Sequence, residues 1–231
     1  MSERGSSWKS LSLAIAGIVV LLSVLAWFDK AECEGVADSG GSRHVALVVD
    51  RSGSMEFLVA DVINNVNAVI DSLPPADRVS ILFFESPFGV VRYVENQPVD
   101  NVRPLTFNDY FPMGGTPLYD AIGVAIRDIV TPTLGTVGGA DQGILIVLSD
   151  GEENTSMRFS LDDARAAVQA ALDLGVDIRF YGMGPAATYE ASALGIPLSN
   201  TVQVSQTAEG LNEAFEDVQR SLSQGATERQ C

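Results

Sequence analysis

Two apolar runs, each ending in an aspartate, constrain the fold of this chain more than any other feature. Residues 45–49 (VALVV) lead into Asp50, and residues 143–149 (GILIVLS) lead into Asp150. Short runs rich in Val, Ile and Leu are typical of strands that are buried on both faces. Strands of this type are connected by helices, which predicts an α/β sheet with both aspartates at the carboxyl ends of its strands.

The rest of the chain continues this alternation. The periodicity predicts strands at 44–50, 78–84, 90–94, 143–149, 176–181 and 201–204, and helices near 56–73, 117–131, 160–174 and 208–223, with a helical turn at 188–194. Because only a few residues separate the second and third strands, we expect them to form a hairpin. The predicted fold is therefore a doubly wound, mostly parallel central sheet with one antiparallel edge strand and helices on both faces. An irregular stretch is expected at 95–113.

The N-terminal segment has a different character. Residues 11–28 (LSLAIAGIVVLLSVLAWF) form an uncharged run of 18 residues, close to the length that crosses a bilayer as a helix. Arg4 and Lys9 precede it and acidic residues follow, so the positive-inside rule keeps the N-terminus cytoplasmic. We expect a cytoplasmic segment at 1–10, a transmembrane signal anchor at 11–28, a linker at 29–41, an extracytoplasmic domain at 42–224 and a tail at 225–231. A cleaved signal peptide, giving a secreted protein, is the alternative.

Charge and cysteine content limit the possible binding partners and the cellular compartment of the domain. The net charge is −16 and lysine occurs only at Lys9 and Lys30, which argues against nucleic acid and anionic membrane surfaces as partners. We expect the chain to contact the membrane through its N-terminal helix. Cys33 and Cys231 are the only cysteines. In an exported domain they are candidates for one disulfide that joins the domain's two ends, with unrelated thiols or intermolecular pairing as alternatives.

Polar residues from three separate loops are expected to meet at one edge of the sheet. Asp50 is followed by Ser52 and Ser54, Thr116 lies in a Gly-Gly-Thr-Pro turn before a helix, and Asp150 follows the central strand. Hydroxyl and carboxylate oxygens with only two acids among them suit a hard divalent cation that keeps some waters. We expect Mg²⁺, with Mn²⁺ or Ca²⁺ as alternatives. Zinc would favour histidine or cysteine ligands.

These residues resemble the motifs of the von Willebrand factor type A domain. Residues 50–54 (DRSGS) match the family's Asp-x-Ser-x-Ser, residues 115–120 (GTPLYD) match its threonine loop, and residues 149–151 (SDG) match its second aspartate. In that family these groups form the metal-ion-dependent adhesion site. The resemblance implies that Ser52, Ser54 and Thr116 supply hydroxyl oxygens, while Asp50 and Asp150 act mainly through waters.

The function expected on this basis is cation-dependent protein binding or adhesion, in which a partner's Asp or Glu carboxylate completes the ion's coordination. No enzymatic activity is expected. An accessory or structural subunit of an envelope complex, docked through the same domain, is one alternative. A magnesium-dependent phosphotransfer enzyme of the haloacid-dehalogenase kind is another, but Ser52 stands where that family has aspartate and no lysine follows Lys30. A serine hydrolase would have only His44 as a base, and His44 lies within a predicted strand.

Three residues beside the motifs have two interpretations each. Arg51 is expected either to steer an acidic partner towards the metal or simply to be exposed. Glu152 and Glu153 are expected to lie in a solvated loop, with a role in ligand preference or cation affinity as the alternative.

Overall fold

A computed structural model describes residues 41–134, 140–150 and 152–227 of the chain. The predicted membrane anchor at 11–28 and both cysteines of the predicted disulfide lie outside these residues. Within the described part of the chain, no helix has the length and apolar character needed to cross a membrane.

The core of the structure is one mixed sheet of six strands, as predicted. The strand order is β3-β2-β1-β4-β5-β6, in which β3 pairs antiparallel with β2 at one edge and every other pairing is parallel. The strands are β1 (Arg43–Asp50), β2 (Arg78–Glu85), β3 (Gly89–Pro98), β4 (Gln142–Ser149), β5 (Asp177–Met183) and β6 (Thr201–Val204). Because β1 and β4 are parallel neighbours, their carboxyl ends lie side by side, and Asp50 and Asp150 leave the sheet at the same end. We name this end the carboxyl edge of the sheet.

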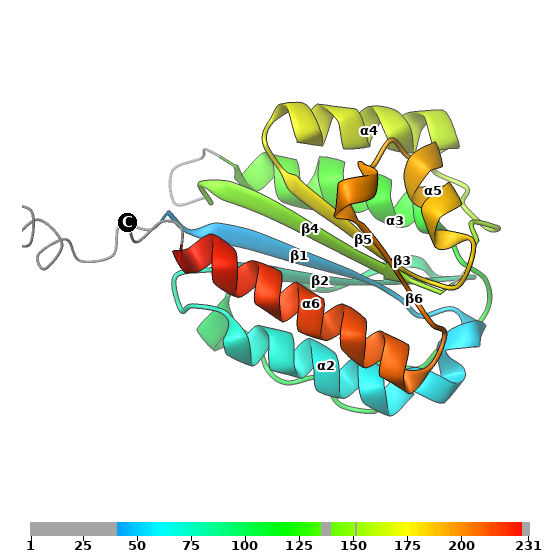
Figure 1. Cartoon of the computed structure of the whole chain (residues 1–231), viewed down its shortest axis with the longest axis horizontal. Coiled ribbons are helices and arrows are strands. Elements are labelled where there is room, and N and C mark those ends of the chain that lie inside the picture. The colour runs from blue at the N-terminus through cyan, green and yellow to red at the C-terminus, as the bar shows by residue number, and fades with distance from the viewer. Residues whose placement is uncertain (1–40, 135–139, 151, 228–231) are drawn as a thin grey trace, which may run out of the picture. The chain divides into compact units, whose positions relative to one another are not determined.

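Helices cover both faces of this sheet (Figure 1). One face packs against α2 (Val59–Ser72) and α6 (Ala208–Thr227), and the other against α3 (Leu118–Val124), α4 (Leu161–Asp173) and α5 (Ala187–Ala193). Strand β1 is buried along its whole length and sends alternate residues to each side. Val45, Leu47 and Val49 join the core below α2 and α6, whereas Ala46 and Val48 join the opposite core. This explains why the apolar run is continuous.

Several boundaries differ from the predicted ones. The helix expected at 56–73 begins as a 3-10 turn, η1 (Gly53–Leu58), before α2. The single helix expected at 117–131 consists of α3, a π-helical turn η3 (Ala125–Val130) and a 3-10 turn η4 (Thr131–Thr133). Pro132 has no backbone N–H to continue a regular helix, which fits the break there. Short 3-10 turns at η2 (Val99–Asn101) and η5 (Leu198–Asn200) complete the structure.

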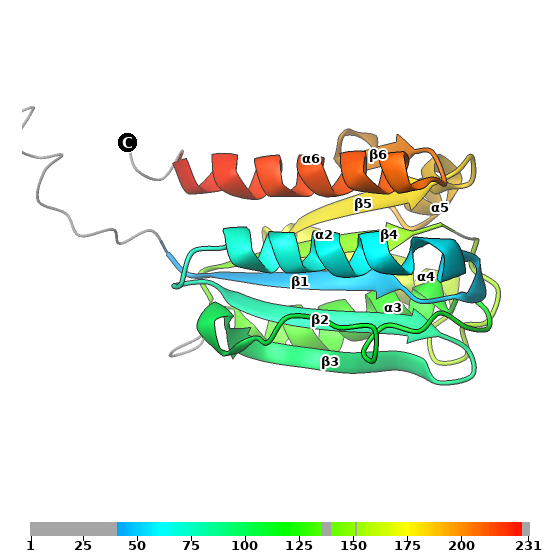
Figure 2. The same ribbon diagram turned by 90° about the horizontal axis from the view of Figure 1, so that it is seen from below.

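The stretch expected to be irregular at 95–113 is partly strand. Strand β3 continues to Pro98, past a bulge in its pairing with β2 and past Asn96, which has a positive φ of 47°. The crossing segment, residues 102–113, then runs back over β2 (Figure 2). Asn67 of α2 holds this segment through both main-chain groups of Leu105. It therefore covers the part of the sheet that α2 and α6 leave open.

Candidate metal centre

Asp50 is the buried anchor of the polar cluster at the carboxyl edge of the sheet. As the last residue of β1, it is fully buried, and each of its carboxylate oxygens accepts a hydrogen bond. The Ser52 amide donates to Oδ1 at 2.8 Å, and the Ser149 hydroxyl donates to Oδ2 at 2.6 Å. Its main-chain oxygen accepts a bond of 2.5 Å from the Tyr110 hydroxyl of the crossing segment. These contacts fix both the strand end and the orientation of the carboxylate.

A chain of side-chain hydrogen bonds leads from Ser52 to the second aspartate. The Ser52 and Ser54 hydroxyl oxygens are 3.0 Å apart, and Ser54 donates to Asp150 Oδ1 at 2.8 Å. Gln206, just before α6, donates to the other oxygen of Asp150 at 2.6 Å. Ser52 is buried, Asp150 is half-buried and Ser54 is exposed, so the cluster opens to solvent on one side.

Thr116 joins this cluster through the main chain of its glycine turn. The Gly53 amide donates to the Gly114 carbonyl at 3.0 Å, which links the turn to the first loop. Gly114 has a φ of 62°, and a Cβ there would lie 1.8 Å from the Ser86 carbonyl oxygen, so only glycine fits. Thr116 itself is buried and follows directly. The structure thus brings all five predicted site residues to one edge of the sheet.

The loop after Asp150 is bound tightly to the start of α3. Asn154 Oδ1 accepts the Thr116 amide at 2.8 Å, and the Asn154 amide donates to the Thr116 carbonyl at 3.1 Å. Glu153 accepts hydrogen bonds from the amides of Tyr119, Thr155 and Ser156. The prediction of a solvated loop around Glu153 is therefore wrong, because this carboxylate satisfies main-chain donors of two segments. Glu152 is exposed.

Asp120 of α3 makes the reciprocal contact. Its carboxylate accepts the amides of Met157, Arg158 and Phe159 at 2.7 to 3.0 Å. The Thr116 turn and the segment 153–159 consequently form one hydrogen-bonded unit, so a change in either is expected to displace both.

Arg51 has neither of its predicted roles, since it is buried and does not face solvent. Its guanidinium forms two hydrogen bonds with the fully buried carboxylate of Glu85, at 3.0 and 2.7 Å, and donates to the Asp109 carbonyl at 3.0 Å. It also lies over the Phe111 ring, 4.4 Å from the centroid. Arg51 therefore ties the first loop to β2 and to the crossing segment.

The electrostatics of the cluster favour a cation. Burial raises the pKa of the Asp50 carboxyl from 3.8 to about 6, although hydrogen bonds from Ser149 and Ser52 oppose the shift. The negative charge of Asp150 also raises this pKa. Two carboxylates that repel each other in a partly buried site gain stability when a positive charge lies between them.

The donor set fits a hard divalent cation. The candidate ligands are the hydroxyl oxygens of Ser52, Ser54 and Thr116 and the carboxylates of Asp50 and Asp150, all of them oxygen donors. Among the described residues, no group of three or more His, Cys, Asp or Glu is placed to hold a metal. A site with so few acids suits an ion that keeps several waters, as Mg²⁺ does.

Replacing Gly115 by alanine should damage the site. A Cβ at Gly115 would lie 2.5 Å from Asn154 Oδ1 and 2.7 Å from the Thr155 methyl carbon, so the Asn154 contact with the Thr116 amide must break. We expect Gly115→Ala to lower the free energy of unfolding by about 1 to 3 kcal/mol, the usual cost of overpacking, and to weaken cation binding measured by titration calorimetry. Gly53→Ala is the matched control, because a Cβ at Gly53 would meet nothing closer than the Gly114 carbonyl oxygen, at 3.4 Å. Equal losses in the two variants would contradict the prediction.

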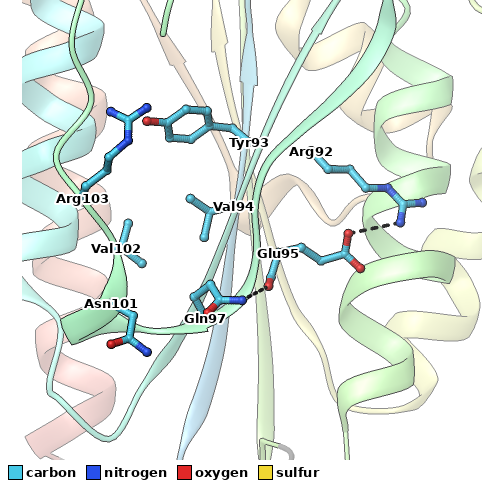
Figure 3. Close-up of a pocket in the computed structure, with 8 residues that line it drawn as sticks. All are labelled: Arg92, Tyr93, Val94, Glu95, Gln97, Asn101, Val102 and Arg103. Carbon is cyan, nitrogen blue, oxygen red and sulfur yellow. Dashed lines mark hydrogen bonds and ion pairs between the residues drawn. The ribbon is translucent and has the colours of Figure 1, made fainter.

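A separate hollow of about 420 Å³ lies along the edge strand β3 and contains none of the five candidate ligands. Tyr93 and Val94 of β3 face Val102 and Arg103 of the crossing segment across it (Figure 3). Its arginines are engaged within the protein, Arg92 with Asp128 and Arg103 with Asp109. The candidate cation ligands lie in the polar cluster and not in this hollow.

Some residues of the site could not be identified from the sequence. Ser149 carried a signal, because it ends β4 directly beside the end of β1. Gln206, Tyr110 and Glu85 come from distant segments, and no local pattern marks them as neighbours of the cluster.

Comparison with known proteins supports the same fold. Proximal thread matrix protein 1 from the mussel byssus has a TM-score of 0.58 at 17% identity, covering 81% of this chain and 47% of that protein. The pilus adhesin SpaC from Lactobacillus rhamnosus GG has a TM-score of 0.63 at 15% identity, covering 80% and 31%. The von Willebrand factor domain of a type V pili tip protein from Porphyromonas gingivalis has a TM-score of 0.61 at 11% identity, covering 80% and 96%.

This chain therefore spans about half of the byssus protein and under a third of SpaC. A search of curated proteins finds no match. The sequence model of the von Willebrand factor type A domain matches residues 44–220, which include β1 from its second residue, the other five strands in full and all five candidate ligands. The chain belongs to the von Willebrand factor type A domain family.

Proposed function

We propose that this chain binds a partner protein through a divalent cation held by Asp50, Ser52, Ser54, Thr116 and Asp150, with the partner supplying an Asp or Glu carboxylate. The observation that carries the proposal is the hydrogen-bonded series from Asp50 through Ser52 and Ser54 to Asp150, at the carboxyl edge of the sheet. Mg²⁺ is the cation proposed for this site.

The neutral and the charged ligands of the proposed site have different roles. Hydroxyl groups donate oxygen without adding negative charge, while Ser149 and the Ser52 amide hold Asp50 in place. A cation bound here would keep enough positive charge to accept a further carboxylate from another molecule. The exposed side of the cluster, at Ser54, gives such a ligand access.

The chain's single histidine does not contribute to this site, which favours recognition over acid–base catalysis. His44 is buried near the start of β1, at the opposite edge of the sheet, with Thr133 and Ser80 hydroxyls 2.6 and 2.8 Å from its ring nitrogens. Burial, helped by the charge of Arg78, lowers its pKa to about 4. An imidazole in this position cannot serve as a base beside Asp50.

Structural neighbours support an adhesive role and a divalent cation. SpaC is described as a pilus adhesin, and the mussel byssus protein has also been crystallised with zinc in its metal-ion-dependent adhesion site. For this chain we further propose that residues 11–28 anchor the protein in a membrane, with the domain on the extracytoplasmic side.

Partner capture tests the proposal. The full chain, solubilised in detergent and immobilised, should retain partners from an extract of its source in Mg²⁺ and release them in chelator. Thr116→Ala should lose the same partners in Mg²⁺, because it removes one proposed ligand oxygen. Thr188→Ala, on the exposed side of α5, is the control and should bind normally. Identical captures in Mg²⁺, in chelator and with Thr116→Ala would rule out the cation-bridged mechanism.

A further inference from the structure

A groove of about 600 Å³ lies beside the candidate metal centre. One wall is the turn between β2 and β3, with Ser86, Pro87 and Phe88, and the other is the segment 154–157. We name it the hairpin groove. Pro117, which directly follows Thr116, lines it as well, so the groove begins one residue from a proposed cation ligand.

The charged groups at the groove are already satisfied within the protein. Glu85 lines the groove and is paired with Arg51. Asp120 also lines it, and its carboxylate accepts three main-chain amides, without a cationic side chain among those donors. A second carboxylate from a partner would be repelled by Asp120 and would find no free positive group here.

The rim of the groove is apolar. Phe88 is 63% exposed and Met157 is 96% exposed, and they come from opposite walls. In a chain with a net charge of −16, large exposed apolar side chains on both sides of a groove point to a binding surface. The Thr155 hydroxyl is buried in the wall of the groove and has no hydrogen-bond partner among the described residues.

We propose that the hairpin groove receives a large apolar side chain of the same partner segment whose carboxylate binds the cation. The partner class is thus an extended peptide segment with an Asp or Glu and, within two positions, a Phe, Tyr, Leu or Met. This inference rests on the proposed function, because the carboxylate is what places the segment beside the groove. The groove then discriminates among acidic peptide segments that the cation alone would bind equally well.

Peptide selection tests the groove directly. Short random linear peptides displayed on phage are bound to the full chain in Mg²⁺ and eluted with chelator. The eluted peptides should share an acidic residue with a large apolar residue within two positions. Replacing that apolar residue with alanine in a synthetic peptide should weaken binding about tenfold or more, since its burial is lost.

A double variant separates the groove from the metal centre. Phe88→Ser combined with Met157→Ser should weaken binding of the selected peptide about tenfold. The double variant should leave binding of the alanine-substituted peptide and the Mg²⁺-induced rise in melting temperature unchanged. Leu198→Ser is the control. Leu198 is 62% exposed in η5, directly before β6, the edge strand on the other side of the sheet from β3. This substitution should not change the binding of either peptide.

The outcomes distinguish the two proposals. Acidic peptides without an apolar preference, or a double variant that keeps the preference, would overturn the role of the groove and leave cation-bridged binding intact. Peptides that bind equally in chelator, or a selection that yields none eluted by chelator, would overturn both.

Discussion

Arg51→Met should lower the free energy of unfolding by about 3 to 5 kcal/mol, the usual cost of leaving a buried charge without its partner. The Glu85 carboxylate is fully buried and takes two hydrogen bonds from Arg51. The variant also loses the bond to the Asp109 carbonyl and the contact with the Phe111 ring. Chemical denaturation in chelator, where the cation does not contribute, measures the effect.

Two further variants test the cause. Arg51→Met combined with Glu85→Leu should recover much of the lost stability, because apolar groups of similar size replace both charges. Arg220→Met removes a surface ion pair with Asp217 and should cost less than about 1 kcal/mol. A double variant as unstable as the sum of the single variants would show that the ion pair is not the source of the loss.

Asp50→Asn should make the cation-free protein more stable and abolish its response to Mg²⁺. The pKa of Asp50 is about 6, above its ordinary value of 3.8, so the folded state disfavours the ionised carboxyl. At neutral pH, keeping this carboxyl ionised in the folded state costs roughly 3 kcal/mol of stability. An amide can replace only part of the pairing with Ser52 and Ser149, which costs about 1 kcal/mol. We expect a net gain of roughly 1 to 2 kcal/mol in chelator.

The pH dependence follows from the same shift. Because the folded pKa lies above the unfolded one, the cost of ionising Asp50 is absent below about pH 4 and complete above about pH 6. The advantage of Asp50→Asn in chelator should therefore grow across this window. Saturating Mg²⁺ should stabilise the unmodified protein by about 3 kcal/mol at a hundred times its dissociation constant, and should leave the variant unchanged.

Asp71→Asn provides the control for this experiment. Asp71 is exposed near the end of α2, at the opposite edge of the sheet from Asp50. Its substitution should alter neither the stability in chelator nor the response to Mg²⁺. If Asp50→Asn destabilised the cation-free protein across the whole pH window, the assigned cost of burying this carboxylate would be wrong.

Local patterns were sufficient to predict the sheet. The continuous apolar runs of β1 and β4 indicated strands buried on both faces, and the short turn after β2 indicated an antiparallel edge. Boundaries were less accurate where distant contacts decide them. Strand β3 extends past its expected end because β2 continues to pair with it up to Pro98.

The sequence by itself determined the α/β order and the identity of the five candidate ligands, because strand ends and loop motifs are local features. Only the tertiary structure decided what surrounds them. Arg51 looked like a surface residue from its place in a polar loop, but Glu85 and the crossing segment bury it. Glu153 looked solvated, but the amide of Tyr119 lies within its reach. Hydrogen-bond partners more than thirty residues away in sequence have no local signature, so they could be identified only from the tertiary structure.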